Sequence, residues 1–123
     1  MNFTDEELLA LIHRMLYSLG LTAEHTGFFH SAYSILLVCR DPERLHAATK
    51  LLYPETADHY HTTWGSVERN IRYVINLLWR DHPNRLSDLA GYTILRKPTP
   101  RKFISLSAAK VQGLFPVQTT ADA

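Results

Sequence analysis

The stretch from Trp64 to Arg80 limits the fold most, because its apolar residues recur with the period of an α-helix. At about 100° per residue, one stripe holds Val67, Ile71, Val74, Ile75 and Leu78. The opposite stripe holds Arg69, Arg72, Tyr73, Asn76 and Arg80. A segment of this kind buries one side against other elements and exposes the other. It therefore predicts an amphipathic helix with a polar outer face.

The first half of the chain also predicts helices, separated by single Gly and Pro residues. Thr4 and Glu7 form a capping box, which predicts a helix that ends near Gly20. The segment Phe28–Cys39 is apolar on most sides, so it predicts a central helix. Asp41-Pro42 is expected to open a third helix with Pro54 as its limit. The expected inner face of that third helix is Leu45, Ala48, Leu51 and Leu52.

The second half predicts two helices joined by a tight turn, followed by two more helices. Residues 54–60 predict a short helix, His61-Thr62-Thr63 a turn with Thr63 as N-cap, and the long helix follows. Further on, we expect a short helix over Leu86–Ala90, a loop over 92–99 and a last helix from Pro100 to about Gln112. No stretch alternates apolar and polar residues as an exposed strand requires. The prediction is an all-α, compact bundle of about six helices containing a helix-turn-helix.

Composition and length favour one small globular domain. The chain has 123 residues, of which 46% are hydrophobic and 20% charged, which excludes a disordered chain. We expect a single domain over 1–115, with the helix-turn-helix at about 54–80 and a flexible tail over 116–123. The longest uninterrupted apolar run, Ile35–Cys39, is too short to span a bilayer. Cys39 is the single cysteine, expected to be a small buried residue, and this usage is typical of a reducing, cytoplasmic compartment.

Charge is distributed unevenly along a chain whose formal net charge is only +1. Residues 1–30 carry four acidic residues against Arg14, whereas residues 96–110 carry five basic residues and no acidic one. Such asymmetry can present one basic face to a polyanion. The basic residues expected to contact phosphate groups are Arg96, Lys97, Arg101 and Lys102. The alternative for this cluster is a solvated helix start.

The outer side of the long helix carries side chains of the types that can read base edges. An arginine can donate two hydrogen bonds to guanine, and a glutamate can accept one from cytosine, which assigns base contacts to Glu68, Arg69 and Arg72. Because the second helix of a helix-turn-helix enters the major groove by its N-terminal half, these residues are well placed. The flanking residues expected near the DNA backbone are Thr62, Thr63, Ser66 and Tyr73. The alternative for Glu68 and Arg72 is an ion pair along the helix.

Other functional classes receive little support. The seven histidines lack the spacing of metal ligands, so neither a metal nor another cofactor is expected. No phosphate-binding glycine loop or nucleophile motif is present, so the chain is not expected to be an enzyme. Trp64 and Trp79 flank the long helix and are interpreted as packing anchors.

The sequence resembles the C-terminal DNA-binding domain of the sporulation stage-zero regulator A family. The resemblance covers about Ile12 to Val111, and its longest stretch is LLYPETADHYHTTWGSVERNIRYVINLLW at Leu51–Trp79. GYT at Gly91–Thr93 and KPT followed by FI within Lys97–Ile104 extend it. The resemblance implies an all-helical domain that binds short boxes in promoters.

The resemblance also implies which residues contact DNA and which partners to expect. Base reading falls to Val67-Glu68-Arg69 and Ile71-Arg72, whereas Ser66 and Tyr73 depart from the arginine and histidine typical of the family. Partners implied are promoter DNA, an RNA polymerase sigma factor through the region of Asp81–Ala90, and a second copy on tandem sites.

Family members carry an N-terminal receiver domain. Because this chain begins close to the first helix of the DNA-binding half, phosphorelay control is not expected to act within it.

Two functions follow as hypotheses. The first is a transcription regulator that binds duplex DNA through Glu68, Arg69 and Arg72. The second is a helical interaction module that has lost DNA affinity and modulates full-length regulators or RNA polymerase. Ser66 and the near-neutral net charge favour the second hypothesis, whereas the basic segment of residues 96–110 favours the first.

Overall fold

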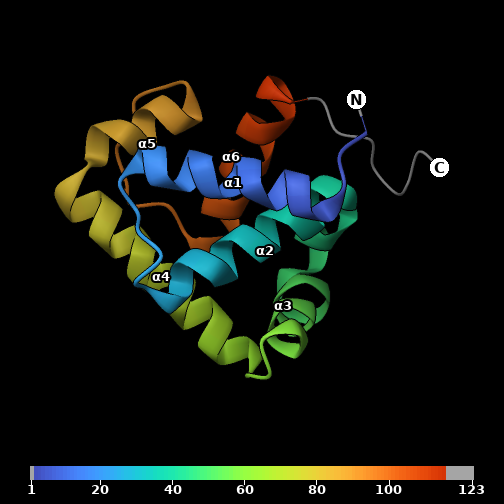
Figure 1. Cartoon of the computed structure of the whole chain (residues 1–123). Coiled ribbons are helices and arrows are strands. Elements are labelled where there is room, and N and C mark those ends of the chain that lie inside the picture. The colour runs from blue at the N-terminus through green and yellow to red at the C-terminus, as the bar shows by residue number, and fades with distance from the viewer. Residues whose placement is uncertain (1, 116–123) are drawn as a thin grey trace.

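The computed structural model describes residues 2–115, which form an all-α bundle (Figure 1). Its α-helices are α1 (Asp5–Leu19), α2 (Thr26–Arg40), α3 (Tyr53–His59), α4 (Trp64–Asp81), α5 (Pro83–Ala90) and α6 (Pro100–Leu114). A 3-10 helix (Pro42–Ala47) and a π-helix (Ala48–Leu52) connect α2 to α3. No strand occurs within residues 2–115. The predicted all-α class with about six helices is confirmed. The expected flexible tail, 116–123, lies outside the described residues.

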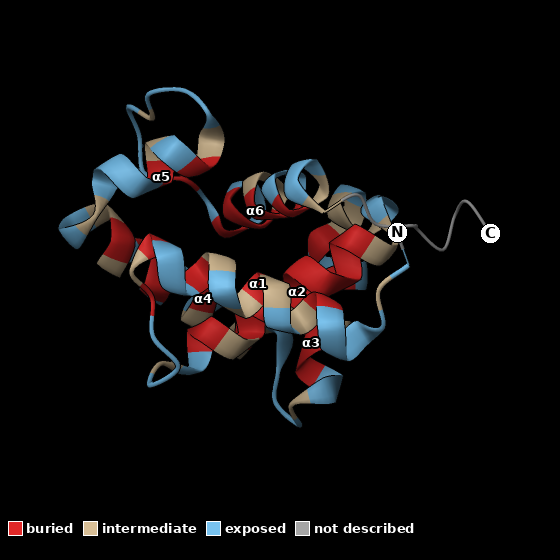
Figure 2. Cartoon of the chain, turned by 45° about the horizontal axis from the view of Figure 1, so that its top comes forward, coloured by how far each residue is buried: buried red, intermediate tan, exposed pale blue. Residues whose placement is uncertain are grey.

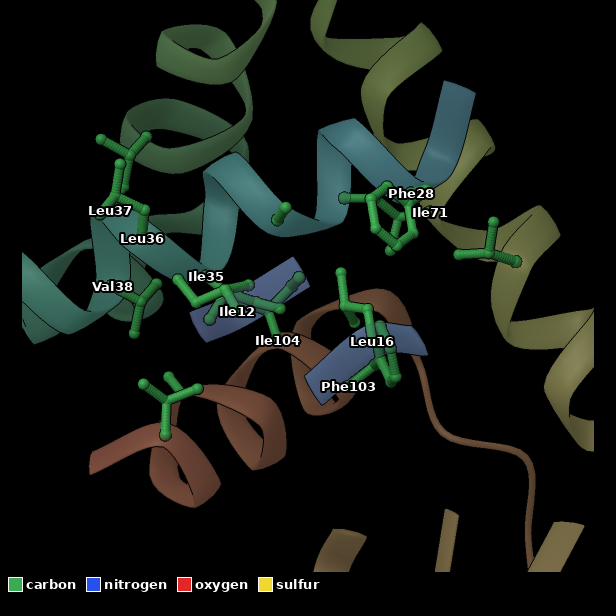
Figure 3. Packing of buried hydrophobic residues seen from close by; sticks show 14 of the residues in the cluster. Ile12, Leu16, Phe28, Ile35, Leu36, Leu37, Val38, Ile71, Phe103 and Ile104 are labelled. Atoms are coloured by element: carbon green, nitrogen blue, oxygen red, sulfur yellow. The ribbon is translucent and has the colours of Figure 1, made fainter. Parts of the chain in front are cut away.

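Helix α2 is central, as its apolar composition predicts. It packs against α1, α4 and α6, and its small residues allow neighbouring helices to approach on several sides. Figure 3 shows the core beside α2, where Phe28 and Ile35 lie near side chains of α1 and α6. The buried core residues from α1 and α6 include Ile12, Leu16, Phe103 and Ile104. Burial of such side chains stabilises the fold by about 1.5–3 kcal/mol each.

Local signals set the ends of several helices. The Thr4 side chain accepts a hydrogen bond from the Glu7 backbone N–H (3.1 Å), and the Glu7 carboxylate accepts one from the Thr4 N–H (3.0 Å). Helix α1 ends at Gly20, whose φ of 107° is the left-handed conformation that glycine adopts without strain. Thr99 caps α6 by accepting a bond from the Lys102 backbone N–H (3.2 Å). The capping box and the Gly20 terminus are confirmed.

The expected third helix is wrong in type and in one of its inner residues. Residues 42–52 form a 3-10 helix followed by a π-helix. Ala47, at the junction of the two helices, has a non-helical φ of −140°. These two helix types rotate successive residues by angles that differ from the 100° assumed for an α-helix. As a result, Leu51 is 52% exposed, whereas Leu52 is fully buried.

The boundaries of α2, α5 and α6 also differ from the predicted ones. Helix α2 begins at Thr26, ahead of Gly27, and ends at Arg40. Helix α5 begins at Pro83, because proline is well tolerated in the first turn of a helix. Helix α6 continues to Leu114.

Buried residues gather where the helices face one another, and exposed residues cover the outside (Figure 2). Cys39 belongs to the core at 1% exposure, and burial raises the pKa of its thiol to about 12. The interpretation of this cysteine as a small buried residue is confirmed. None of the helices within residues 2–115 combines the length and the apolar character that a membrane span needs.

Candidate nucleic-acid interface

Helices α3 and α4 form a helix-turn-helix at the lower edge of the molecule in Figure 1. The backbone N–H of Thr62 donates to the carbonyl oxygen of Ala57 (2.9 Å), which closes the turn behind α3. His61 has φ 55° and takes the left-handed position that glycine fills in many such turns. Thr63 then caps α4, because its hydroxyl oxygen accepts a bond from the Ser66 N–H (3.1 Å). The predicted turn and N-cap are confirmed.

The inner stripe of α4 is buried as predicted. The residues at 0–1% exposure are Val67, Ile71, Val74, Ile75 and Leu78. The helix lies very close to the start of α2, where a β-carbon at Gly27 would stand 2.1 Å from the carbonyl oxygen of Asn70. Near this crossing, the Asn70 side-chain amide lies 3.5 Å from Nδ1 of His30, which is 2% exposed. The orientation of α4 is therefore set by rigid packing against α2.

The outer side of α4 carries the side chains that the sequence assigned to base reading. Arg69 is exposed, and its Nη2 donates to the Ser66 hydroxyl oxygen (3.1 Å). Arg72 is exposed as well, and its Nη2 donates to Oε1 of Glu68 (2.6 Å). The Glu68 side chain retains 25% exposure and the Arg72 side chain 52%. The ion pair predicted as an alternative thus forms, on a surface that remains open to solvent.

Sequence reasoning did not select a buried tyrosine whose pKa is influenced by both members of this ion pair. Tyr53 is 2% exposed, and burial is the main cause that raises its pKa to about 12. Glu68 raises that pKa further, whereas Arg72 and Arg101 lower it. Arg101 Nε also donates to the Leu45 carbonyl oxygen (2.8 Å). Arg101 therefore ties the start of α6 to the 3-10 helix at Pro42–Ala47.

Tyr73 connects the outer face of α4 to the loop between α1 and α2. It is 50% exposed, and its ring packs edge-on against His25 with centroids 5.5 Å apart. Both residues line a polar groove of about 370 Å³, which Arg80 and Asp81 border from the end of α4. No spacing signal in the sequence pointed to His25, because its partner is distant along the chain.

The remaining predicted phosphate contacts lie on exposed segments. Thr62 and Thr63 are exposed in the turn, and Lys102 is exposed in the first turn of α6. Arg96 and Lys97 are exposed in the loop before α6 and share a groove of about 450 Å³ with Lys102. Within residues 2–115, no hydrogen bond or ion pair joins this loop pair to α4. The structure thus ties Arg101 to the 3-10 helix through Leu45 and leaves Arg96 and Lys97 on their own loop.

The two tryptophans behave differently. Trp79 is partly buried and packs against the core, as expected of an anchor. Trp64 is 50% exposed, so its interpretation as a packing anchor is wrong. It is the first residue of α4, directly after the Thr63 N-cap. Over residues 2–115, no three His, Cys, Asp or Glu side chains gather closely enough to hold a metal ion.

The fold and this surface define a helix-turn-helix protein whose second helix is buried on one side and polar on the other. Residues 12–111 match the family described as Sporulation initiation factor Spo0A C terminal. Because the match covers most of the chain, the protein belongs to this family. The family comprises DNA-binding domains of sporulation regulators and is not an enzyme family. DNA binding in transcription regulation is therefore the function class, and DNA is the partner.

Proposed function

We propose that the protein is a sequence-specific, double-stranded DNA-binding transcription regulator that reads the major groove with the N-terminal half of α4. Residues 1–115 act as one DNA-binding domain, with the helix-turn-helix at about 54–80. Glu68, Arg69 and Arg72 contact base edges. This function requires the chain to reach chromosomal DNA, and hence to lie in the cytoplasm.

The observation that carries the proposal is the shared outward placement of a carboxylate and two guanidinium groups on one well-packed helix. Arg69 and Arg72 supply forked donors for the O6 and N7 atoms of guanine. Glu68 supplies an acceptor for the N4 amine of cytosine. Because Glu68 contacts Arg72, the two side chains can bind neighbouring bases together. Packing of the buried inner stripe fixes the position of α4, so the side chains that contact bases need little rearrangement on binding.

Contacts to phosphate groups would fix the protein on the duplex without reading sequence. The residues proposed for this role are Thr62, Thr63, Ser66, Tyr73, Arg96, Lys97, Arg101 and Lys102. Thr62 and Thr63 lie at the start of α4, where free backbone N–H groups and the helix dipole favour an anion. Arg101 and Lys102 extend positive charge from the start of α6.

Selection of bound duplexes from a random oligonucleotide pool tests sequence-specific reading directly. We expect an enriched motif for the wild-type protein. Arg69→Ala should weaken binding to the selected duplex about 5- to 100-fold, the range of one bidentate guanine contact. Arg14→Ala, an exposed arginine on α1, is the matched control and should bind like wild type. No enriched motif, or equal binding by Arg69→Ala and wild type, would refute the proposal.

The two protein partners that remain predictions need separate tests, of which the selected sequences supply one. A second copy on tandem sites would appear as a repeated motif with fixed spacing in the enriched pool. A sigma factor contact through residues 81–90 would require substitutions on exposed positions of α5, such as Asn84, to reduce transcription without reducing DNA binding.

A further inference from the structure

Ser66 lies at the centre of a hydrogen-bonded chain on the first turn of α4. Its hydroxyl oxygen accepts a bond from the Thr63 hydroxyl (3.0 Å) and a second bond from Nη2 of Arg69 (3.1 Å). Thr63 is itself fixed, because its hydroxyl oxygen caps the helix through the Ser66 backbone N–H (3.1 Å). The Arg69 guanidinium is therefore tied to the rigid end of the recognition helix.

This arrangement uses both acceptor positions of the Ser66 hydroxyl. Arginine loses up to about 2 kcal/mol of side-chain conformational freedom when it is ordered. A guanidinium that is already held by one N–H group loses less of that freedom when it meets its target. The Arg69 side chain is exposed, so its remaining N–H groups are accessible to a ligand.

We propose that Ser66 is a positioning residue for Arg69, and that its hydroxyl holds the guanidinium in the orientation that donates two bonds to a guanine. The inference rests on the proposed DNA-reading function. It assigns to Ser66 a role in specificity rather than a contact to the DNA backbone alone. Arg72 is held by Glu68 instead, so loss of the Ser66 hydroxyl should alter base preference at one position only.

A purely structural role for Ser66 is separable from this positioning role. Thr63 caps the helix through the backbone N–H of residue 66, which Ser66→Ala retains. Alanine also favours helix more than serine does, so Ser66→Ala should unfold at the same or a higher temperature than wild type. Ser66→Thr keeps a hydroxyl at this position and serves as the conservative rescue. Ser18→Ala on α1 removes an exposed helical hydroxyl far along the chain and is the matched control.

The experiment measures equilibrium binding to the duplex that wild type selects. The guanine read by Arg69 is first located as the position whose preference disappears for Arg69→Ala. At that position, binding is compared for guanine and for 7-deazaguanine, which lacks the N7 acceptor. We expect Ser66→Ala to bind the guanine duplex about three- to tenfold more weakly and to discriminate less against 7-deazaguanine. Ser66→Thr should recover most of both properties, and Ser18→Ala should match wild type.

A double-mutant cycle gives an independent measure. If Ser66 acts through Arg69, Ser66→Ala should weaken binding less in the Arg69→Ala background than in wild type, because a phosphate contact of Ser66 contributes equally in both backgrounds. Unchanged affinity and base preference in Ser66→Ala, while Arg69→Ala loses both, would overturn the positioning role and leave the proposed function intact. Failure of wild type to select any motif would refute the proposed function itself.

Discussion

Gly27 and Asn70 lie in direct backbone contact where α2 crosses α4. A β-carbon at Gly27 would stand 2.1 Å from the Asn70 carbonyl oxygen, closer than any real non-bonded carbon can lie. The position of α4, the recognition helix, therefore depends on Gly27 of α2 having no side chain. The close approach also brings the imidazole of His30 near the Asn70 amide.

Gly27→Ala should destabilise the protein because the two helices must move apart to admit a methyl group. Overpacking of this kind typically lowers the free energy of unfolding by about 1–3 kcal/mol. Urea unfolding followed by circular dichroism measures the change. Gly65→Ala is a close control, since Gly65 is also the second residue of its helix and has no atom within 4 Å of its β-carbon position. Gly65→Ala should be neutral or slightly stabilising, and equal destabilisation of both variants would contradict the steric explanation.

His61 has a left-handed backbone conformation in the turn between α3 and α4, and this conformation is unfavourable for a residue with a β-carbon. His61→Gly should raise the free energy of unfolding by about 0.5–1 kcal/mol, because glycine adopts a φ of 55° without strain. His61→Val should lower it, since a β-branched side chain is poorly tolerated at positive φ. Thermal unfolding of the three proteins provides the comparison. The same melting temperature for all three would show that the turn conformation contributes nothing to stability.

Stability should fall below about pH 6.5 because burial lowers the pKa of His30 and of His13. In this range the unfolded chain binds protons that the native imidazoles do not, so protonation favours unfolding. The loss begins as pH falls through the ordinary histidine pKa and ends at the lower native value. Each histidine adds a slope of at most about 1.4 kcal/mol per pH unit.

Urea midpoints between pH 5 and 8 test this dependence on His30. His30→Gln retains a hydrogen-bonding side chain beside Asn70 but does not titrate, so its stability should depend less steeply on pH. His46→Gln is the control, because that histidine is exposed. An unchanged slope in His30→Gln would exclude His30 as a source of the acid sensitivity.

DNA affinity should depend on salt through the basic start of α6. If Lys102 contacts a phosphate, Lys102→Gln should reduce the slope of log K against log salt by about 0.9 and weaken binding on all sequences alike. Lys110→Gln lies on the same helix near its other end and should leave the slope unchanged. Binding titrations at several salt concentrations give the slopes. Equal slopes for Lys102→Gln and wild type would remove Lys102 from the interface.

Strong local signals made most of the helices predictable. The capping box at Thr4 and the periodic stripe beginning at Val67 depend only on neighbouring residues, and both are present as expected. The segment 42–52 was not predictable in the same way, because packing against other helices selects 3-10 and π turns that sequence periodicity does not encode. Leu51 is exposed for that reason.

The composition of the recognition surface was predictable, whereas its internal contacts were not. Helical spacing alone places Glu68, Arg69 and Arg72 on the outer side. The burial of Tyr53 and the packing of His25 on Tyr73 depend on residues far apart in the sequence. The exposure of Trp64 likewise depends on which parts of α4 the other helices cover, which only the assembled bundle determines.

The pairing of Arg72 with Glu68 has a consequence for how the protein would search for its sites. Half of the guanidinium charge at the reading surface is already compensated before any duplex arrives, so general attraction to nucleic acid is weak there. Residence on unrelated sequences should accordingly be brief, and retention should depend on matching hydrogen bonds with the correct base pairs. Such a surface favours rapid rejection of wrong sites over tight holding of any site.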